Sequence, residues 1–179
     1  MVTRRKSLWK PLPAREARLR ARRIRLVLTD VDGVLTDTGI YYSANGEELY
    51  RFSRRDGMGF DLLHAAGIEA GVMTSEPSPI IRRRAEKLAL RQVHLGVRDK
   101  AAHLERILAQ SDLAPDQIAY IGDDVNDLAV IRAVGVKGLT GAPGDAVPEV
   151  LRSVHYRCTA AGGNGAFREF AAWILSMRA

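Results

Sequence analysis

The sequence predicts an α/β fold, in which a mainly parallel sheet carries helices on both faces. Short apolar runs typical of buried strands alternate along the chain with amphipathic helical patterns, and this alternation indicates a parallel sheet with helical crossovers. Polar residues able to do chemistry directly follow several of these runs. Ligands of such folds bind beyond the carboxyl ends of the strands. The length of 179 residues fits about one domain.

The first strand is expected at residues 25–31, which contain a continuous Leu-Val-Leu stretch. Residues 40–43 and 47–52 are also strand-like, and the dipeptide Asn45-Gly46 lies between them. Asn-Gly favours the tight turn of a β-hairpin, because both residues tolerate positive φ angles. The sequence therefore predicts a hairpin directly after the first strand.

Helices and strands alternate in the rest of the chain. Gly67 suits a helix end, and Pro77 suits a helix start, where a missing N–H costs little. The predicted helices span residues 56–66, 77–90, 99–110, 125–134 and 165–177, and the predicted strands span residues 68–73 and 117–121.

The net charge of +6 is a property of the N-terminus. Residues 1–23 hold nine Lys or Arg residues and one acid, Glu16, whereas the rest of the chain has eighteen basic and twenty acidic residues. We expect a basic extension over residues 1–23 and one folded domain over residues 24–179. Because the body is slightly acidic, nucleic acid is not the expected partner. A solvated extension explains the tail, and an anionic partner or organelle targeting is the alternative.

Cysteine content and hydropathy indicate the cellular compartment of the protein and its relation to membranes. The single cysteine, Cys158, cannot form an internal disulfide, which suits a reducing cytoplasm. No apolar run approaches the ~18 residues of a membrane span. We therefore expect a cytoplasmic protein without a membrane partner.

Polar groups follow the predicted strands in an order that suggests catalysis. Asp30 and Asp32 follow the first strand, Thr74 follows a later one, Lys100 opens a helix, and Asp123 follows the strand that precedes the fourth helix. Each alone has an ordinary explanation as a turn residue, a helix cap or a solvated charge. Their joint placement at successive strand ends favours an active site.

These residue types suit phosphoryl transfer. Asp30 could attack phosphorus and form a covalent intermediate, while Asp32 could protonate the leaving alkoxide and then deprotonate water. Mg²⁺ prefers oxygen ligands, so Asp30, Asp123 and the backbone carbonyl of Asp32 would hold it. Lys100 would neutralise the remaining charge, and Thr74 would donate a hydrogen bond to a phosphoryl oxygen.

The chain resembles the haloacid dehalogenase superfamily of phosphohydrolases. The resemblance covers roughly residues 25–175 and implies a Rossmann-like fold, magnesium dependence and the roles given above. We expect Asp124 and Asp127 behind the metal ligands, with Asp127 orienting Asp123 or Lys100, or else reaching the metal through water. The motifs that carry the resemblance are Asp30-Val31-Asp32-Gly33, Thr74, Lys100, and Gly122-Asp123-Asp124 with Asp127.

A narrower resemblance is to the 3-deoxy-manno-octulosonate 8-phosphate phosphatase group. Its close relatives hydrolyse the 9-phosphates of nonulosonates, and both kinds of enzyme make building blocks of bacterial surface glycans. The implied substrate is a small sugar phosphate. The matching segments are residues 30–37, 55–59, 119–124 and 162–169.

No separate cap domain fits between the motifs. The chain between Asp32 and Thr74 has room for a hairpin and one helix–strand unit, and the chain between Thr74 and Lys100 has room for one helix. We expect residues 39–52 to form a small flap. The resemblance implies a homotetramer in which a neighbouring subunit completes the site. An open site for macromolecular phosphates is the alternative, and a regulatory domain without turnover is disfavoured because every key group is present.

The segment after Thr74 bears on the substrate. Octulosonate phosphatases typically carry Gly-Arg there, whereas this chain has Ser75-Glu76. The nonulosonate enzymes have Glu and share the Arg-Arg-Arg-Ala-Glu-Lys sequence of residues 82–87. Their likeness implies that Glu76 accepts hydrogen bonds from sugar hydroxyls, that Lys87 holds Glu76 or the substrate, and that Arg84 reaches a neighbouring subunit's substrate. An ordinary basic helix surface also explains the arginines. We expect a nonulosonate 9-phosphate as the favoured substrate and octulosonate 8-phosphate as the alternative.

Overall fold

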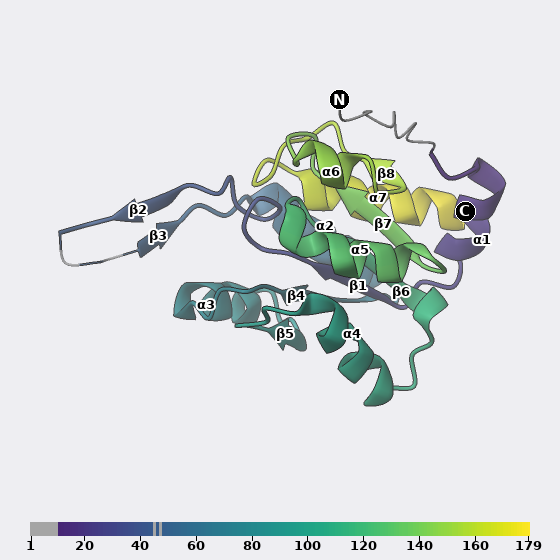
Figure 1. Ribbon diagram of the computed structural model, residues 1–179, viewed down its shortest axis with the longest axis horizontal. Coiled ribbons are helices and arrows are strands. Elements are labelled where there is room, and N and C mark those ends of the chain that lie inside the picture. The colour runs from purple at the N-terminus through teal and green to yellow at the C-terminus, as the bar shows by residue number, and fades with distance from the viewer. Residues whose placement is uncertain (1–10, 45, 47) are drawn as a thin grey trace, which may run out of the picture.

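The computed structural model describes residues 11–44, 46 and 48–179 of the chain (Figure 1). Residues 1–10 of the predicted extension and Asn45 of the predicted turn lie outside this description. The described chain forms a central sheet, two helical layers and a projecting hairpin.

Six described strands form one parallel sheet, which confirms the predicted fold class. They are β1 (Leu26–Thr29), β4 (Glu69–Met73), β5 (Gln92–His94), β6 (Ile118–Ile121), β7 (Leu139–Ala142) and β8 (Tyr156–Arg157). Their order is β5-β4-β1-β6-β7-β8. The chain therefore moves outward from β1 in both directions, which opens a crevice at the carboxyl ends of β1, β4 and β6.

Helices cover both faces of the sheet (Figure 1). One layer contains α1 (Ala14–Ala21), α2 (Arg54–Ala65), α3 (Pro79–Lys87) and α7 (Ala166–Arg178). The other contains α4 (Lys100–Ala109), α5 (Leu128–Gly135) and α6 (Pro148–Leu151). Successive residues of β1 point to opposite faces, so Val27 joins one core while Leu26 and Leu28 join the other. Among the described helices, none has the length and apolar character needed to cross a membrane.

Three strands and several helix starts differ from the sequence-based expectation. The sequence did not predict β5, β7 or β8, because they are only two to four residues long and β7 reads Leu-Thr-Gly-Ala. The helix predicted from residue 77 starts at Pro79, where Ser78 Oγ accepts the N–H of Ile80 at 3.2 Å. The helix predicted from residue 125 begins as the 3₁₀ turn Val125–Asp127, and a second 3₁₀ turn, Pro115–Gln117, precedes β6.

The described part of the basic N-terminal segment packs on the body. Ala17 and Ala21 of α1 are buried, and α1 lies beside α7 (Figure 1). The guanidinium of Arg20 donates to the carbonyls of Gly135 and Gly138 at 3.0 and 2.9 Å. These carbonyls lie at the end of α5, where a cation is favoured by the helix dipole.

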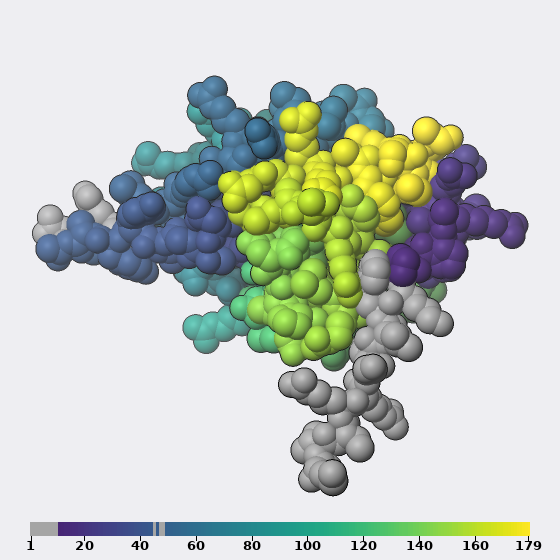
Figure 2. All heavy atoms as spheres, turned by 90° about the horizontal axis from the view of Figure 1, so that it is seen from above, coloured from purple at the N-terminus to yellow at the C-terminus, as the bar shows by residue number. Residues whose placement is uncertain are grey.

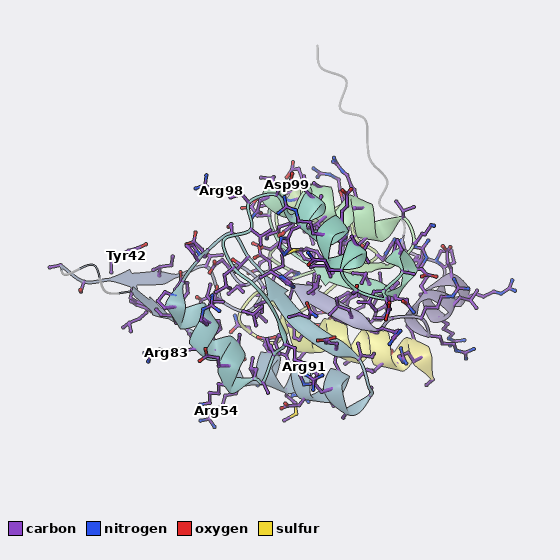
Figure 3. The ribbon with its side chains drawn as sticks, turned by 90° about the horizontal axis from the view of Figure 1, so that it is seen from below. Tyr42, Arg54, Arg83, Arg91, Arg98 and Asp99 are labelled. Carbon is purple, nitrogen blue, oxygen red and sulfur yellow. The ribbon has the colours of Figure 1, made fainter. Side chains whose placement is uncertain are left out.

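The predicted hairpin is confirmed by the antiparallel pairing of β2 (Ile40–Tyr42) with β3 (Glu48–Tyr50). Figures 1 and 2 show it extending away from the body, and Figure 3 shows Tyr42 far out on it. No cap domain is present among the residues that the structure describes. A hairpin of this length is at best marginally stable alone.

The glycine-rich segment before α7 is fixed against the loop that follows β1. The N–H of Gly163 donates to Val34 O at 2.9 Å, and a Cβ added to Gly162 would lie 2.1 Å from Gly33 O. Buried Asp56 accepts N–H groups from Gly165, Phe167 and Arg168, so it caps the start of α7. Residues 55–59 and 162–169, which carry the narrower family resemblance, therefore pack together and support the loop that follows β1.

Candidate active site

A cleft of about 300 Å³ lies beyond the carboxyl ends of β1, β4 and β6. It collects carboxylates from two separate strand ends, as expected from the sequence. The residues that line it are Asp30, Asp32, Thr38, Ser75, Asp123, Asp124, Val125 and Asn126.

Asp30 is held in a fixed orientation at the end of β1. Its N–H donates to Ile121 O at 3.0 Å, which continues the β1–β6 ladder by one residue. The carboxylate is 4% exposed. Its Oδ1 accepts the N–H of Val31 at 2.7 Å, and its Oδ2 lies 2.6 Å from Lys100 Nζ. These contacts point one carboxylate into the cleft in a single rotamer.

Lys100 is buried at the first position of α4 and touches two carboxylates. Its Nζ lies 2.6 Å from Asp30 Oδ2 and 2.6 Å from Asp127 Oδ1. Asp99, labelled in Figure 3, caps the helix by accepting the N–H of Ala102 at 3.0 Å. A cation at a helix N-terminus opposes the helix dipole. The two ion pairs therefore offset the unfavourable interaction with the helix dipole and keep the Lys100 ammonium at the start of α4.

Asp127 is completely buried and joins both halves of the site. Its Oδ1 accepts from Lys100, and its Oδ2 accepts the N–H of Asp123 at 3.0 Å. Asp124 is exposed and caps the 3₁₀ turn Val125–Asp127 that follows it, because its Oδ1 accepts the N–H of Val125 at 2.6 Å. That turn carries Asp127 back beneath Asp123.

Asp123 has a buried oxygen suited to a metal ion. Its Oδ1 is buried and has no hydrogen-bond partner among the described residues, which is costly for a carboxylate. Carboxylate oxygens of Asp30, Asp123 and Asp127 lie within 4.8 Å of one another. Gly33, with φ +80°, lets Asp123 approach, since a Cβ there would lie 1.9 Å from Asp123 Oδ2. The donor set fits a hard divalent cation.

The crowding of charges shifts the pKa values of these groups. Burial, together with Asp127, raises the pKa of Asp30, while Lys100 opposes the rise. Burial, Asp127 and Asp124 raise the pKa of Asp123 to about 7. Burial disfavours the charged form of Lys100, but the attraction of Asp30 and Asp127 outweighs it and raises the Lys100 pKa. The carboxylates of the site thus outnumber the one ammonium that contacts them, which disfavours their full ionisation.

Asp32 lines the cleft, and Thr74 directly precedes the cleft-lining Ser75. Thr74 is 1% exposed, and its N–H donates to His94 O at 2.9 Å, which fixes it between β4 and β5. Its Oγ1 accepts the N–H of Glu76 at 3.1 Å. Asp32 is half-buried, and its Oδ1 accepts from Thr36 Oγ1 at 3.3 Å.

The three predicted substrate-binding residues are not brought together within one chain. Glu76 is exposed next to the cleft-lining Ser75, whereas Lys87 is exposed at the far end of α3. A nine-residue helix is about 13 Å long. Arg84 is half-buried against its own chain, with Nη2 3.3 Å from Ser53 O and the guanidinium 5.7 Å from the centre of the Phe52 ring. Arg83 of the same helix points to solvent (Figure 3).

Sequence reasoning missed two residues at the site. Tyr120 of β6 is fully buried, and its phenol donates to Asp127 Oδ1 at 2.7 Å. Thr38 lines the cleft with a φ of +65°, a conformation that is rare for threonine. A phenol within an otherwise aliphatic strand two residues before Gly122 was a usable signal for Tyr120.

Known proteins match the chain over most of its length. The 3-deoxy-D-manno-octulosonate 8-phosphate phosphatase of Haemophilus influenzae is 40% identical over 152 residues, which are 85% of this chain and 83% of that protein. The cobalt-bound structure of the deoxy-D-mannose-octulosonate 8-phosphate phosphatase from Haemophilus influenzae has a TM-score of 0.83 at 38% identity, and the match covers 89% of this chain and 91% of that one.

A third match was solved with ligands. The 3-deoxy-D-manno-octulosonate 8-phosphate phosphatase of Moraxella catarrhalis, in complex with magnesium, phosphate and a KDO molecule, has a TM-score of 0.85 at 32% identity. The match covers 91% of this chain and 92% of that one. No protein-family model matches the chain.

The parallel sheet, the carboxylate cluster and these relatives lead to one conclusion. Identity of this level over more than four fifths of both chains is far beyond a likeness of fold alone. The chain belongs to the 3-deoxy-D-manno-octulosonate 8-phosphate phosphatase family of the haloacid dehalogenase superfamily, a family of phosphomonoester hydrolases.

Proposed function

We propose that the chain is a magnesium-dependent phosphatase that hydrolyses 3-deoxy-D-manno-octulosonate 8-phosphate through an aspartyl-phosphate intermediate on Asp30. One observation carries the proposal. Asp30, Lys100 and Asp123 converge on one cleft in a chain that is 40% identical to an octulosonate 8-phosphate phosphatase. Sequence reasoning placed this substrate second, and the relatives move it to first place.

The first step transfers the phosphoryl group to the protein. A carboxylate oxygen of Asp30 forms a bond to phosphorus as the bond between phosphorus and the ester oxygen breaks. Asp32 gives its proton to the leaving alkoxide. Lys100 and the hydroxyl of Thr74 stabilise the phosphoryl oxygens by an ion pair and a hydrogen bond.

The second step returns the protein to its starting state. Asp32, now a carboxylate, takes a proton from water as the water oxygen attacks phosphorus. The bond between phosphorus and Asp30 breaks, and inorganic phosphate leaves. The hydrogen bond from Thr36 to Asp32 keeps this carboxyl oriented in both steps.

The carboxylates of Asp30 and Asp123, with the backbone carbonyl of Asp32, would hold magnesium. When bound, magnesium supplies positive charge that offsets the repulsion between the carboxylates and the phosphoryl group. Asp127 supports these groups from behind, because it already accepts hydrogen bonds from Lys100 and from the N–H of Asp123.

A nonulosonate 9-phosphate is the second candidate substrate, and Glu76 favours it. The hydrogen bond from its N–H to Thr74 keeps this exposed residue next to the phosphoryl site. Its carboxylate can accept hydrogen bonds from sugar hydroxyls, which is the contact that the likeness to the nonulosonate enzymes implies. Arg84 lies against its own chain, so its proposed substrate contact belongs to a neighbouring subunit's cleft.

We also propose that the protein assembles as a homotetramer that completes each cleft. The hairpin exposes Tyr41, Tyr42 and Leu49 to the extent of 66%, 67% and 64%. Apolar side chains gathered on one projecting element indicate a contact surface. A neighbouring subunit that covers the hairpin would both stabilise it and close the open cleft.

Asparagine substitutions test the two catalytic carboxylates. Asp30→Asn is expected to lower kcat on the order of 10³-fold or more, because an amide is a poor nucleophile. Asp32→Asn is expected to lose about 10²- to 10⁴-fold through proton transfer. With p-nitrophenyl phosphate, whose leaving group needs little protonation, Asp32→Asn should accumulate phosphorylated Asp30 that mass spectrometry detects. Retention of more than a few per cent of activity by Asp30→Asn contradicts the covalent mechanism, and exposed Asp61→Asn is the control.

Metal and pH should act on the same carboxyl. The pKa of Asp123 is about 7 in the folded protein and near 3.8 when unfolded, so the folded state binds more protons and loses stability as pH rises through this window. Magnesium needs the carboxylate, so the rise in Tm on adding magnesium should be larger at pH 8 than at pH 6.

Asp123→Asn is the matched variant for this measurement. It should reduce the pH-dependent response to magnesium, with the remainder coming from Asp30, whose pKa burial also raises, and it separates Asp123 from His155. Burial lowers the pKa of His155 to about 4, which affects stability with the opposite sign. A magnesium-induced rise in Tm that is the same at both pH values, or that is undiminished in Asp123→Asn, excludes Asp123 as a ligand.

Light scattering tests the assembly. The unmodified protein should have the mass of a tetramer, and the double variant Tyr41→Ser/Leu49→Ser, which changes a directly opposed pair on the hairpin, should form smaller species with lower activity. Leu19→Ser, which changes an exposed apolar residue on α1, is the control and should leave the mass unchanged. A fully active monomer would rule out the tetramer.

Initial rates with two ulosonate phosphates test the substrate. We expect a higher kcat/KM for octulosonate 8-phosphate than for a nonulosonate 9-phosphate, because the relatives act on the octulosonate. A higher value for the nonulosonate would make the second candidate the substrate. In that case Glu76→Ala should lower kcat/KM for the nonulosonate more than for p-nitrophenyl phosphate. Exposed Glu86→Ala on α3 is the control.

A further inference from the structure

Tyr120 is fully buried on β6, beneath the catalytic carboxylates. Its ring packs in the core cluster that also holds Leu28 and Val130. Its hydroxyl lies at the edge of this apolar cluster and donates a hydrogen bond to Asp127 Oδ1 at 2.7 Å. A buried phenol needs such a partner. The choice of partner matters, because Asp127 Oδ1 also accepts the ammonium of Lys100.

The ammonium of Lys100 is divided evenly between two carboxylates. Its Nζ lies 2.6 Å from Asp30 Oδ2 and 2.6 Å from Asp127 Oδ1. Asp127 Oδ1 already receives the phenol of Tyr120, whereas Asp30, which lines the cleft, presents its Oδ2 to Lys100. A donor on an anionic oxygen spreads its charge and weakens its hold on another cation. Tyr120 therefore reduces the pull of Asp127 on Lys100.

We propose that Tyr120 is a positioning residue, which acts through Asp127 to keep Lys100 on the nucleophile Asp30. Without the phenol, Asp127 Oδ1 has Lys100 as its remaining side-chain donor and draws the ammonium away from Asp30. Asp30 then loses the contact that orients its carboxylate for attack. The inference rests on the proposed roles of Asp30 and Lys100. It assigns Tyr120 no contact with the substrate.

Tyr120→Phe tests this assignment, because it keeps the ring in the core and removes only the hydroxyl. With magnesium and p-nitrophenyl phosphate, kcat per folded molecule should fall about tenfold, the size expected for one hydrogen bond to a charged group. KM should stay within about twofold, because the change acts on the orientation of the nucleophile. Circular dichroism gives the folded fraction and Tm.

Tyr156→Phe is the matched control. Its phenol donates to Glu169 Oε1 at 3.0 Å, so it loses the same kind of bond away from the cleft. It should lower Tm and leave kcat unchanged. If Tyr120→Phe also lowers Tm alone, with kcat per folded molecule intact, Tyr120 is only structural and the proposal is wrong.

A double-mutant cycle asks whether Tyr120 acts through the charge of Asp127. In an Asp127→Asn background, single-turnover rates should change less than twofold on adding Tyr120→Phe, since the neutral amide exerts no comparable pull on Lys100. An undiminished tenfold loss would overturn the proposal. Inactivity of the unmodified enzyme on phosphate esters would instead refute the proposed function, so the two failures are distinguishable.

Discussion

Three carboxylates and one ammonium lie close together, largely buried, at the carboxyl end of the sheet. Asp30, Asp123 and Asp127 lie close enough for their oxygens to face one common point, and Lys100 supplies one positive charge among them. Burial makes that imbalance costly, as the raised pKa values of Asp30 and Asp123 indicate. The cleft therefore favours a cation, and with it a phosphate. Much of the surrounding structure serves to keep these charges close.

The backbone around the cluster is built for close approach. Gly33 has no side chain, which lets Asp123 reach the loop after β1, and Gly122 leaves room for Asp127, whose carboxyl carbon would lie 2.4 Å from an added Cβ. Gly162 also has no side chain, which lets the segment before α7 approach the backbone of the same loop. Asp56 caps the helix that follows. The loop after β1 is thus held by distant parts of the chain, which limits the motion of Asp30.

Sequence reasoning predicted the parts of this arrangement that leave a regular pattern. The strand ends at Asp30, Thr74 and Asp123 could be located because a buried apolar run precedes each polar group. Strand β7 could not, since its sequence Leu-Thr-Gly-Ala has only one large apolar residue, and its burial comes from the elements packed around it. The hairpin was predictable because Asn-Gly lies between two strand-like runs. Its projection from the body depends on tertiary structure.

Contacts that join side chains across elements were outside the reach of the sequence. Nothing in the order of residues says that Tyr120 would meet Asp127, or that Lys100 would stand 2.6 Å from two carboxylates at once. The same holds for Arg84 and Lys87. The family likeness placed both near a substrate, and within one chain Arg84 packs on Phe52 while Lys87 is exposed.

The open cleft and the exposed hairpin raise the question of how water is excluded from the active site. Phosphoryl transfer needs a site that excludes water, because hydrogen bonds and ion pairs to the phosphoryl group strengthen as the dielectric falls. The described chain has no cap domain, and its β2–β3 hairpin points away from the body and exposes aromatic side chains. In the proposed homotetramer, a second copy of the chain would both bury those side chains and cover the cleft. Substrate choice would then depend on residues such as Glu76 on one subunit and Arg84 on another, which separates specificity from the carboxylate chemistry beneath it.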